Sequence, residues 1–383
     1  YNYNGYWKWS TGKNTPNTLS SANPLSLLYD VDNAGTTKRS LGNIQLDYKI
    51  HGLEDLHANV NGGYDVAKST GGNYTVPGSF QTAKDSDFKN IGRGNDWNNL
   101  RRNHLLDFYL NYAKNIESIQ SNINVMAGMQ YDRRDYEITG TSATDIQSEL
   151  GIINGNGVIS IAEAKKNSYA LLSYFGRLNY NYNQKYLIEF NARYDGSSKF
   201  QPENRWKGFY GVSAGWRITE EAFMVNIKKY IEELKIRASY GEVGNQSGIG
   251  LYDGVQLYNF NTASGAYIGD GKVSYIAAAK ELVTTNRTWE RIKNYNVGFD
   301  FTVLNSRLSG SVDLYMKKND NMLIGLLYPG TLGGNAPASN NGKFESKGYE
   351  VRVLDLISME KSHCYNPFVY LQNDNDVQKL VTN

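Results

Sequence analysis

Residues 186–194 read Tyr186-Leu187-Ile188-Glu189-Phe190-Asn191-Ala192-Arg193-Tyr194, and they alternate between two kinds of side chain. Every second residue from Tyr186 onward is apolar, whereas Glu189, Asn191 and Arg193 fall on the opposite side of an extended chain. A period of two is the signature of a β-strand with one apolar face and one wet face. The stretch therefore predicts a strand that separates two different environments.

The same alternation recurs along the chain and predicts eleven strands. They cover residues 42–50, 56–64, 104–113, 119–131, 171–182, 186–195, 208–217, 234–241, 294–303, 307–316 and 349–354. Strands of about nine or ten residues can cross a bilayer at a steep tilt. Short turns alternate with long polar loops between them, as in outer-membrane barrels. We therefore expect an all-β, antiparallel up-and-down meander that forms part of a transmembrane β-barrel, although a soluble β-solenoid or a large soluble antiparallel sheet also fits the alternation.

Two parts of the chain depart from this pattern. Residues 218–233 are charged and helix-prone, and the alternation is lost after Leu354, where only residues 365–371 suggest a further strand. The chain begins at Tyr1 without an export signal and ends at Asn383 without an aromatic closing residue. We expect an internal piece of a longer chain, a partial barrel domain over residues 1–383 with about eleven or twelve strands.

The composition narrows the classes of protein. The 40 basic and 38 acidic side chains give a net charge of +2, so no long-range field favours nucleic acid. The mean hydropathy is −0.55, and the chain has no apolar run near eighteen residues, which excludes a transmembrane helix. A barrel strand is compatible with both values because only every second residue meets lipid. Many of the 30 Tyr, 13 Phe and 6 Trp lie at strand ends, where amphipathic rings suit a membrane boundary.

No motif for catalysis or for a metal is specific enough to propose. Residues 152–163 have the spacing of a calcium loop, with Gly157 sixth and Glu163 twelfth, but Ile152 stands where the first ligand should be. A turn into a short helix at 161–166 is the favoured interpretation. Neither the scattered histidines nor the single Cys364 suggests zinc or a disulfide. We expect no enzyme activity, no metal and no cofactor.

Ligand contacts are expected in the long loops, where aromatic rings lie near hydrogen-bond donors. This chemistry suits sugars, because rings stack on them and amides or guanidinium groups bind hydroxyls. An alternative role for these residues is in the aromatic girdle or in loop stability. The candidates are Trp97, Arg101, Arg102, Asn245, Gln246, Tyr328 and Asn335, the last beside Gly333-Gly334.

Several segments between about Tyr174 and Glu350 occur in a recognisable order. The clearest are Gly176-Arg177-Leu178-Asn179-Tyr180 and Arg193-Tyr194-Asp195-Gly196-Ser197-Ser198-Lys199-Phe200. Others follow at residues 205–206, 212–218, 234–241, 244–245, 296–300, 308–315, 333–335 and 347–350. Together they resemble the barrel of the SusC/RagA-type TonB-dependent transporters of Bacteroidetes outer membranes. The first 170 residues resemble that family only in their pattern of a barrel meander with variable loops.

The resemblance implies a 22-stranded barrel, a size class in which a plugged lumen is expected. The N-terminal plug, the TonB-contacting segment and the closing strands would lie outside this chain. The intact protein would then import oligosaccharides or peptides across the outer membrane of a Gram-negative cell. Its implied partners are a SusD-like surface lipoprotein, the TonB–ExbB–ExbD complex through the missing N-terminal parts, outer-membrane lipid and a glycan or peptide substrate.

Two other functions remain open at this point. A soluble or surface β-protein could bind glycans through aromatic loops, and it would pack the apolar faces of its strands against other protein. A passive porin would have a water-filled lumen and no plug. Six apolar side chains distinguish the soluble protein from the barrel, because they would pack against other protein in the first and face lipid in the second. They are Tyr186, Ile188, Phe190, Tyr210, Val212 and Trp216.

Overall fold

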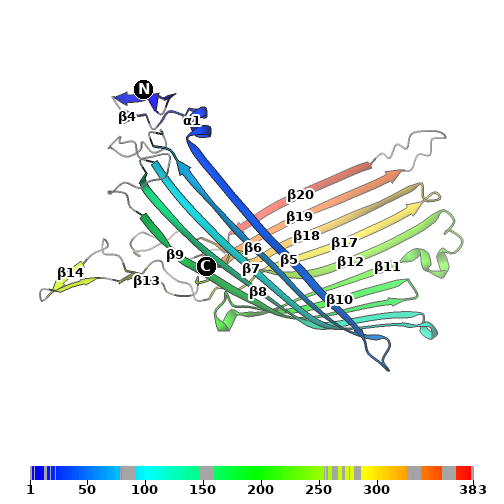
Figure 1. Ribbon diagram of the computed structural model, residues 1–383. Coiled ribbons are helices and arrows are strands. Elements are labelled where there is room, and N and C mark those ends of the chain that lie inside the picture. Colours follow the sequence, from blue (N-terminus) through cyan, green and yellow to red (C-terminus); the bar gives the residue numbers. More distant parts are fainter. Residues whose placement is uncertain are drawn as a thin grey trace. The chain divides into compact units, whose positions relative to one another are not determined.

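A computed structural model shows two compact units, which are described separately (Figure 1). Unit 1 comprises Tyr1–Ile44, Gly62–Leu105 and Arg133–Ser168, and unit 2 comprises Gln45–Asn61, Leu106–Asp132 and Tyr169–Asn383. The structure describes residues 2–3, 5–12, 15–17, 19–21, 23–77, 79, 92–146, 159–253, 255, 258–260, 266–269, 272–275, 277–279, 286–325, 331, 338–355 and 368–380.

An antiparallel meander of twelve strands dominates the fold, and each strand pairs with the next one along the chain (Figure 1). Its strands are β5 (Val31–Lys49), β6 (Leu56–Thr75), β7 (Gly92–Ile116), β8 (Ser121–Ile146), β9 (Ile159–Tyr182), β10 (Tyr186–Ser197), β11 (Trp206–Arg217), β12 (Ile231–Asn245), β17 (Glu290–Val303), β18 (Leu308–Ile324), β19 (Ser339–Asp355) and β20 (Phe368–Leu380).

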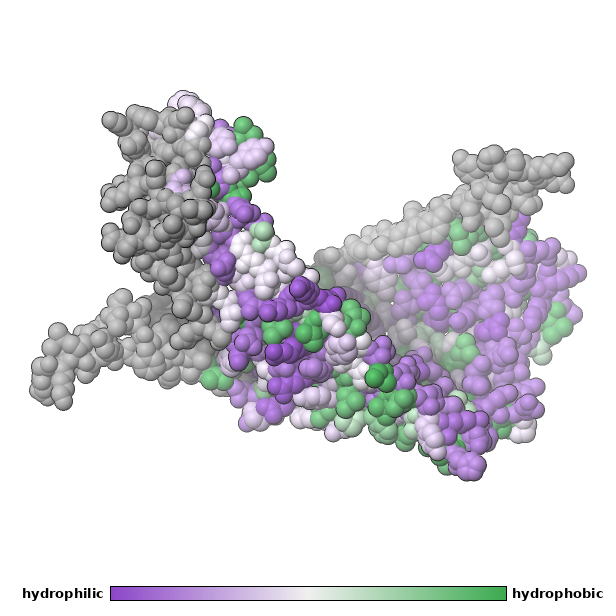
Figure 2. Space-filling view, viewed as in Figure 1, coloured by the Kyte–Doolittle hydropathy of each residue, from purple (hydrophilic) through white to green (hydrophobic). Residues whose placement is uncertain are grey.

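The remaining elements are short. Four two-stranded pairs join β1 (Asn2–Tyr3) to β2 (Tyr6–Trp7), β3 (Ser10–Gly12) to β4 (Thr15–Pro16), β13 (Tyr258–Phe260) to β16 (Ala277–Ala279), and β14 (Ala266–Gly269) to β15 (Lys272–Tyr275). Helix α1 (Pro24–Tyr29) and the 3₁₀ turns η2 (Glu117–Ile119), η3 (Pro202–Asn204), η4 (Ile218–Glu220) and η5 (Ala222–Met224) complete the set. Leu25, Leu27 and Leu28 of α1 are exposed. Figure 2 shows hydrophobic residues on the surface in the region of this helix.

The eleven predicted strands are confirmed, but several of their ends were wrong. Strands β7 and β8 are 25 and 26 residues long, so much of the predicted loops 65–103 and 132–170 is strand. An alternating pattern is readable only where one face meets apolar surroundings, whereas a strand wet on both faces is held by its ladder hydrogen bonds and shows no period. The same reason explains why the helix expected at 161–166 is part of β9.

The two irregular parts of the sequence also have a structure. The helix-prone segment 218–233 forms only the turns η4 and η5 before β12 begins at Ile231. The strand suggested at 365–371 exists as β20, but it begins at Phe368 and continues to Leu380. Most of the calcium-like segment, residues 152–158, lies outside the described residues.

One face of the sheet in unit 2 is apolar and uncovered, and we call it the apolar face. Its cross-strand partners are themselves apolar, since Phe190 stands opposite Leu178 and Val212, and Val212 stands opposite Tyr240. The six side chains that distinguish the alternatives are 38% to 48% exposed, and they are Tyr186, Ile188, Phe190, Tyr210, Val212 and Trp216. Among the described residues no protein packs on this face, as the barrel interpretation expects.

Aromatic rings border the apolar face near the longer connections. Trp206 stacks on Tyr194 with ring centroids 5.2 Å apart, and on Tyr174 with centroids 6.0 Å apart. The indole lies directly over Gly196, its cross-strand partner, where a Cβ atom would lie 2.6 Å from the ring. Glycine at this position therefore leaves the space that the stacked ring occupies.

The Trp206 contact gives a test of the packing. We expect Gly196→Ala to destabilise the folded full-length protein by about 1–3 kcal/mol, because the added methyl displaces the indole. Gly208→Ala is the matched control, since a Cβ atom there would lie 3.7 Å from Tyr194, at ordinary contact distance. Denaturant unfolding in detergent, followed by tryptophan fluorescence, measures both. Equal midpoints for the two variants would contradict this packing.

Unit 2 also holds a small buried core away from the apolar face. It consists of Phe200, Phe209, Ile249 and Trp289, all at most 5% exposed. The indole Nε1 of Trp289 donates to the backbone oxygen of Arg205, at 3.1 Å. This core fixes the connections after β10 and β12 to the ends of their strands.

Candidate functional site

The face of unit 2 opposite the apolar face carries short polar side chains, and we call it the polar face. The cross-strand register lines up one row of them over five strands, from β9 to β17. The members of this row are Asn179, Glu189, Ser213, Ser239 and Asn296. The row presents amide, hydroxyl and carboxylate groups in sequence across the sheet.

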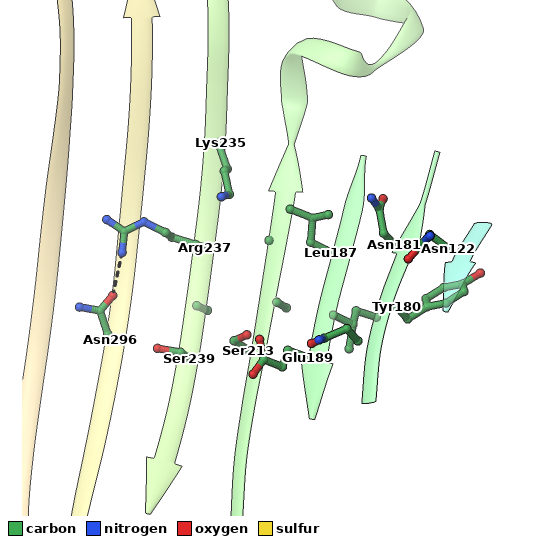
Figure 3. Close-up of a pocket in the computed structure, with 15 residues that line it drawn as sticks. Asn122, Tyr180, Asn181, Leu187, Glu189, Ser213, Lys235, Arg237, Ser239 and Asn296 are labelled. Carbon is green, nitrogen blue, oxygen red and sulfur yellow. Dashed lines mark hydrogen bonds between the residues drawn. The ribbon is translucent and has the colours of Figure 1, made fainter. Parts of the chain in front are cut away.

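A shallow hollow of about 410 Å³ lies over this row (Figure 3). Its floor includes the neighbouring row on the same strands, with Asn181, Leu187, Gly215 and Arg237. Lys235 and Arg237 carry the positive charges at its border, and Glu189 carries a negative one. The hollow therefore offers hydrogen-bond donors and acceptors beside apolar surface, which suits a molecule that carries hydroxyl or amide groups on an apolar frame.

Arg237 organises the charged part of the polar face. Its guanidinium donates to Asp313 Oδ2 at 2.7 Å, to Asp300 Oδ2 at 3.0 Å and to Asn296 Oδ1 at 3.4 Å. Gly298 lies between them in the register, and a Cβ atom there would lie 2.5 Å from the guanidinium carbon. The absent side chain lets Arg237 lie across β17 and reach Asp313 on β18.

Arg193 of the polar face is also held by several partners, one carboxylate on its own strand and two neutral side chains on β8 and β9. Arg193 donates to Asp195 and Gln130 at 2.6 Å each, and to Ser173 at 2.8 Å. Such charge-assisted bonds are stronger than neutral ones and fix the side chains that make them. The Arg193 and Arg237 clusters of the polar face are therefore held in place by their hydrogen bonds.

The predicted contacts in unit 1 lie on a strand, not in a loop. Trp97 and Arg101 belong to β7, and the Trp97 ring covers Gly71, where a Cβ atom would lie 2.4 Å from it. Arg101 lies 3.5 Å from the Asp65 carboxylate, which Arg39 also contacts at 2.7 Å. These two candidates therefore have structural contacts within unit 1.

The remaining candidates differ in their surroundings. Arg102 is exposed on β7. Asn245 ends β12 and donates to Glu290 Oε2 at 2.6 Å, while its own oxygen accepts from the backbone and hydroxyl of Ser247. Gln246 Oε1 is buried without a hydrogen-bond partner among the described residues. Tyr328 and Asn335 lie outside the described residues.

The sequence did not predict the residues of the polar face as a site, because aromatic rings beside hydrogen-bond donors favoured the loops. The signal that could have found them is the set of polar residues at every second position of each alternating strand. These positions include Asn179, Glu189, Ser213 and Ser239, which lie between apolar residues. Their number and their amide, carboxylate or hydroxyl groups could be read from the sequence. Their alignment into one row was not readable, because it depends on the strand register.

The described ranges hold no set of three His, Cys, Asp or Glu side chains placed to bind a metal ion. Among the same residues no helix has both the length and the apolar character needed to cross a membrane.

Comparison with known families identifies the architecture. The model of the family "TonB dependent receptor-like, beta-barrel" matches residues 1–376. The chain belongs to the TonB-dependent receptors. The order of motifs between Tyr174 and Glu350 is thereby explained as the β-barrel sequence of this family, and the match extends through the first 170 residues as well.

Individual TonB-dependent receptors are similar over most of the chain. The TonB-dependent receptor SusC of Bacteroides thetaiotaomicron is 29% identical over 376 residues, which are 98% of this chain and 36% of SusC. A TonB-dependent receptor of Formosa agariphila is 30% identical over 76% of this chain and 28% of its own length. The chain therefore spans about a third of these relatives.

The fold of this TonB-dependent receptor chain is also found in a solved structure. The structure of the RagAB peptide transporter superposes with a TM-score of 0.79, at 21% identity, over 93% of this chain and 38% of the other. The same importer in its open-open state gives a TM-score of 0.80. The predicted resemblance to the SusC/RagA type is confirmed.

Proposed function

We propose that the full-length protein imports an oligosaccharide or a peptide across the outer membrane of a Gram-negative cell. The observation that carries this proposal is the match to the TonB-dependent receptor barrel over residues 1–376. Import in this proposal is driven by TonB, ExbB and ExbD, which would act through parts of the protein outside residues 1–383. The chain itself contributes a wall of the barrel and carries out no catalysis.

The two faces of the sheet support a membrane location. Uncovered apolar side chains on one face match the lipid-facing band of a barrel, and the paired polar side chains on the other match a wet lumen. The aromatic rings around Trp206 and the ring pair Tyr182–Tyr186 lie at opposite ends of the strands, as the girdles of such barrels do. Outer-membrane lipid is accordingly the proposed partner of the apolar face.

The substrate class is proposed from the chemistry of the polar face. The row Asn179, Glu189, Ser213, Ser239 and Asn296 offers donors and acceptors that sugar hydroxyls or peptide amides can use. The RagAB structures are named as a peptide transporter and importer, and SusC is similar over 98% of this chain. A SusD-like surface lipoprotein is the proposed partner on the outside of the cell.

The loop candidates of the sequence remain a proposal for substrate contact. Arg102 and Gln246 fit best, because the first is exposed and the second has a buried oxygen without a partner among the described residues. Asn245 fits less well because Glu290 and Ser247 engage its side chain.

Energy-dependent uptake tests the proposal and separates it from a passive porin. We expect cells that produce the full-length protein to accumulate a labelled oligosaccharide or peptide from a defined mixture, and cells without it to fail. Dissipating the proton-motive force is expected to stop accumulation at unchanged protein levels. Uptake that survives this treatment would favour a passive porin, and no uptake of either class would refute import.

A further inference from the structure

The connection between β11 and β12 is unusual among the described connections at its end of the sheet. The others cover residues 50–55, 117–120, 183–185 and 304–307, whereas this one runs from 218 to 230. It exposes four large apolar side chains, with Phe223 at 65%, Val225 at 67%, Ile227 at 45% and Tyr230 at 59%. A soluble surface rarely leaves so many apolar side chains together in so short a segment.

The beginning of this segment is attached to the apolar face. Glu221 accepts a hydrogen bond from the Tyr186 hydroxyl at 2.6 Å and another from Trp216 Nε1 at 3.1 Å. Tyr186 and Trp216 are the last exposed rings of that face on β10 and β11. The exposed apolar residues after Glu221 therefore continue the apolar face beyond the ends of the strands.

Glu221 also marks the boundary of the hydrocarbon. The hydrogen bond from Tyr186, then that from Trp216, and the contact with Lys185 lower the pKa of the Glu221 carboxyl below its ordinary value. An ionised carboxylate is costly inside hydrocarbon, so this group belongs at the level of the lipid headgroups. The segment that follows begins at that depth.

The backbone of the segment is suited to a poorly hydrated environment. The amides of Lys228 and Ile227 donate to the oxygen of Met224, and the amides of Tyr230 and Ile231 donate to the oxygen of Ile227. Met224 is buried, which fixes the turn to the barrel end. Internal pairing lowers the cost of placing peptide groups near lipid.

We propose that residues 221–230 form an interfacial anchor that inserts into the phospholipid leaflet at the short-turn end of the barrel. The apolar side chains would enter the boundary between headgroups and acyl chains, about 5–10 Å deep. Lys229 lies over the Tyr230 ring at 4.7 Å and is placed to meet a lipid phosphate from the wet side. This inference rests on the outer-membrane location proposed above and concerns a contact with lipid, not with substrate.

Fluorescence quenching in nanodiscs tests the anchor. The full-length protein carries one fluorophore on a single cysteine, in a background in which Cys364 and any other cysteine are replaced by Ser. The nanodiscs contain phosphatidylethanolamine, phosphatidylglycerol and a lipid with a nitroxide near its headgroup. We expect the nitroxide to quench Phe223→Cys roughly twofold or more, and aqueous iodide to quench it weakly, as a side chain at the headgroup boundary requires.

Two control positions make the outcome unambiguous. Ser118→Cys lies in a short exposed turn at the same end of the sheet, in which Ile119 is the one apolar residue, and it should respond to iodide far more than to lipid. Phe190→Cys lies on the apolar face and should respond to a nitroxide on the acyl chain. Val225→Cys replaces Phe223→Cys if the latter does not fold, as judged by heat-modifiable gel mobility.

Each pattern of quenching has one meaning. Quenching of position 223 by lipid supports the anchor. Quenching of 190 by lipid, with 223 responding like 118, overturns the anchor but leaves the membrane location intact. Protection of 223 from both quenchers also overturns it, because protein then covers the segment. Failure of lipid to quench 190 would contradict the membrane location itself.

Discussion

Phe190→Asp is expected to reduce the yield of folded full-length protein severalfold, whereas Asn191→Asp is expected to leave it close to that of the wild type. The two positions are neighbours on β10, and both variants carry the same aspartate. They differ in the face that receives the charge. Phe190 lies on the apolar face and is 44% exposed, while Asn191 lies on the polar face opposite Arg177 and Gly211.

The size of the effect follows from the surroundings of each carboxylate. Near the middle of the bilayer an Arg or Lys on the lipid face of a barrel costs about 2–4 kcal/mol and an Asp costs less, and the cost falls toward the membrane surfaces. Phe190 also stands between Leu178 and Val212, so the lost ring leaves their side chains less well packed. An aspartate at position 191 instead stays in water and gains an attraction to Arg177.

Heat-modifiable gel mobility of outer-membrane preparations measures the folded fraction of each variant. Phe190→Leu serves as a control for the loss of the ring without a charge, and we expect it to fold nearly as well as the wild type. Equal folding of Phe190→Asp and Asn191→Asp would mean that β10 does not face lipid. In that case both the face assignment and the proposed location would have to be abandoned.

The sequence predicted the transmembrane part of the sheet well because lipid imposes a visible pattern there. Phe190, Val212 and Phe299 had to be apolar, and the residues between them did not. The parts of β7 and β8 around Arg93 and Arg133 carry no such alternation in the sequence, and there the strands read as loops. β-Propensity alone could not predict how far those strands extend, because hydrogen bonds to the neighbouring strands set their length.

The candidate site was predictable in its chemistry but not in its positions. Trp97 and Arg101 looked like loop ligands because an aromatic ring and a guanidinium beside polar residues suit a sugar. The structure gives Trp97 a packing role over Gly71 and gives Arg101 an ion pair with Asp65. A partner on another strand cannot be read from sequence spacing, since the register sets it.

The second large effect is expected at Arg237. Arg237→Met removes the guanidinium that bridges Asp300 on β17 and Asp313 on β18. Hydrogen bonds to charged groups are each worth about 1.5–3 kcal/mol. The Arg237 side chain is 33% exposed, so water recovers part of this energy and we expect a loss near the lower end of that range.

Three further variants separate the charge from the geometry. Arg237→Lys should recover only part of the stability, because an ammonium group cannot bridge two carboxylates and Asn296 with a planar fork. Combining Arg237→Met with Asp300→Asn and Asp313→Asn should recover most of it, since no unpaired charge remains. Lys317→Met, which removes an exposed cation from β18, should change stability little.

Guanidinium unfolding of the full-length protein in detergent compares these variants, and labelled-substrate uptake compares their transport. If the network of Arg237, Asp300 and Asp313 only stabilises the sheet, the triple variant should recover both stability and uptake. If its charges also guide the substrate, stability should return while uptake stays low, because the hollow beside Asn296 then keeps Lys235 but lacks Arg237. A single Arg237→Met variant as stable as the wild type would contradict a stabilising role of the ion pairs that Arg237 makes with Asp300 and Asp313.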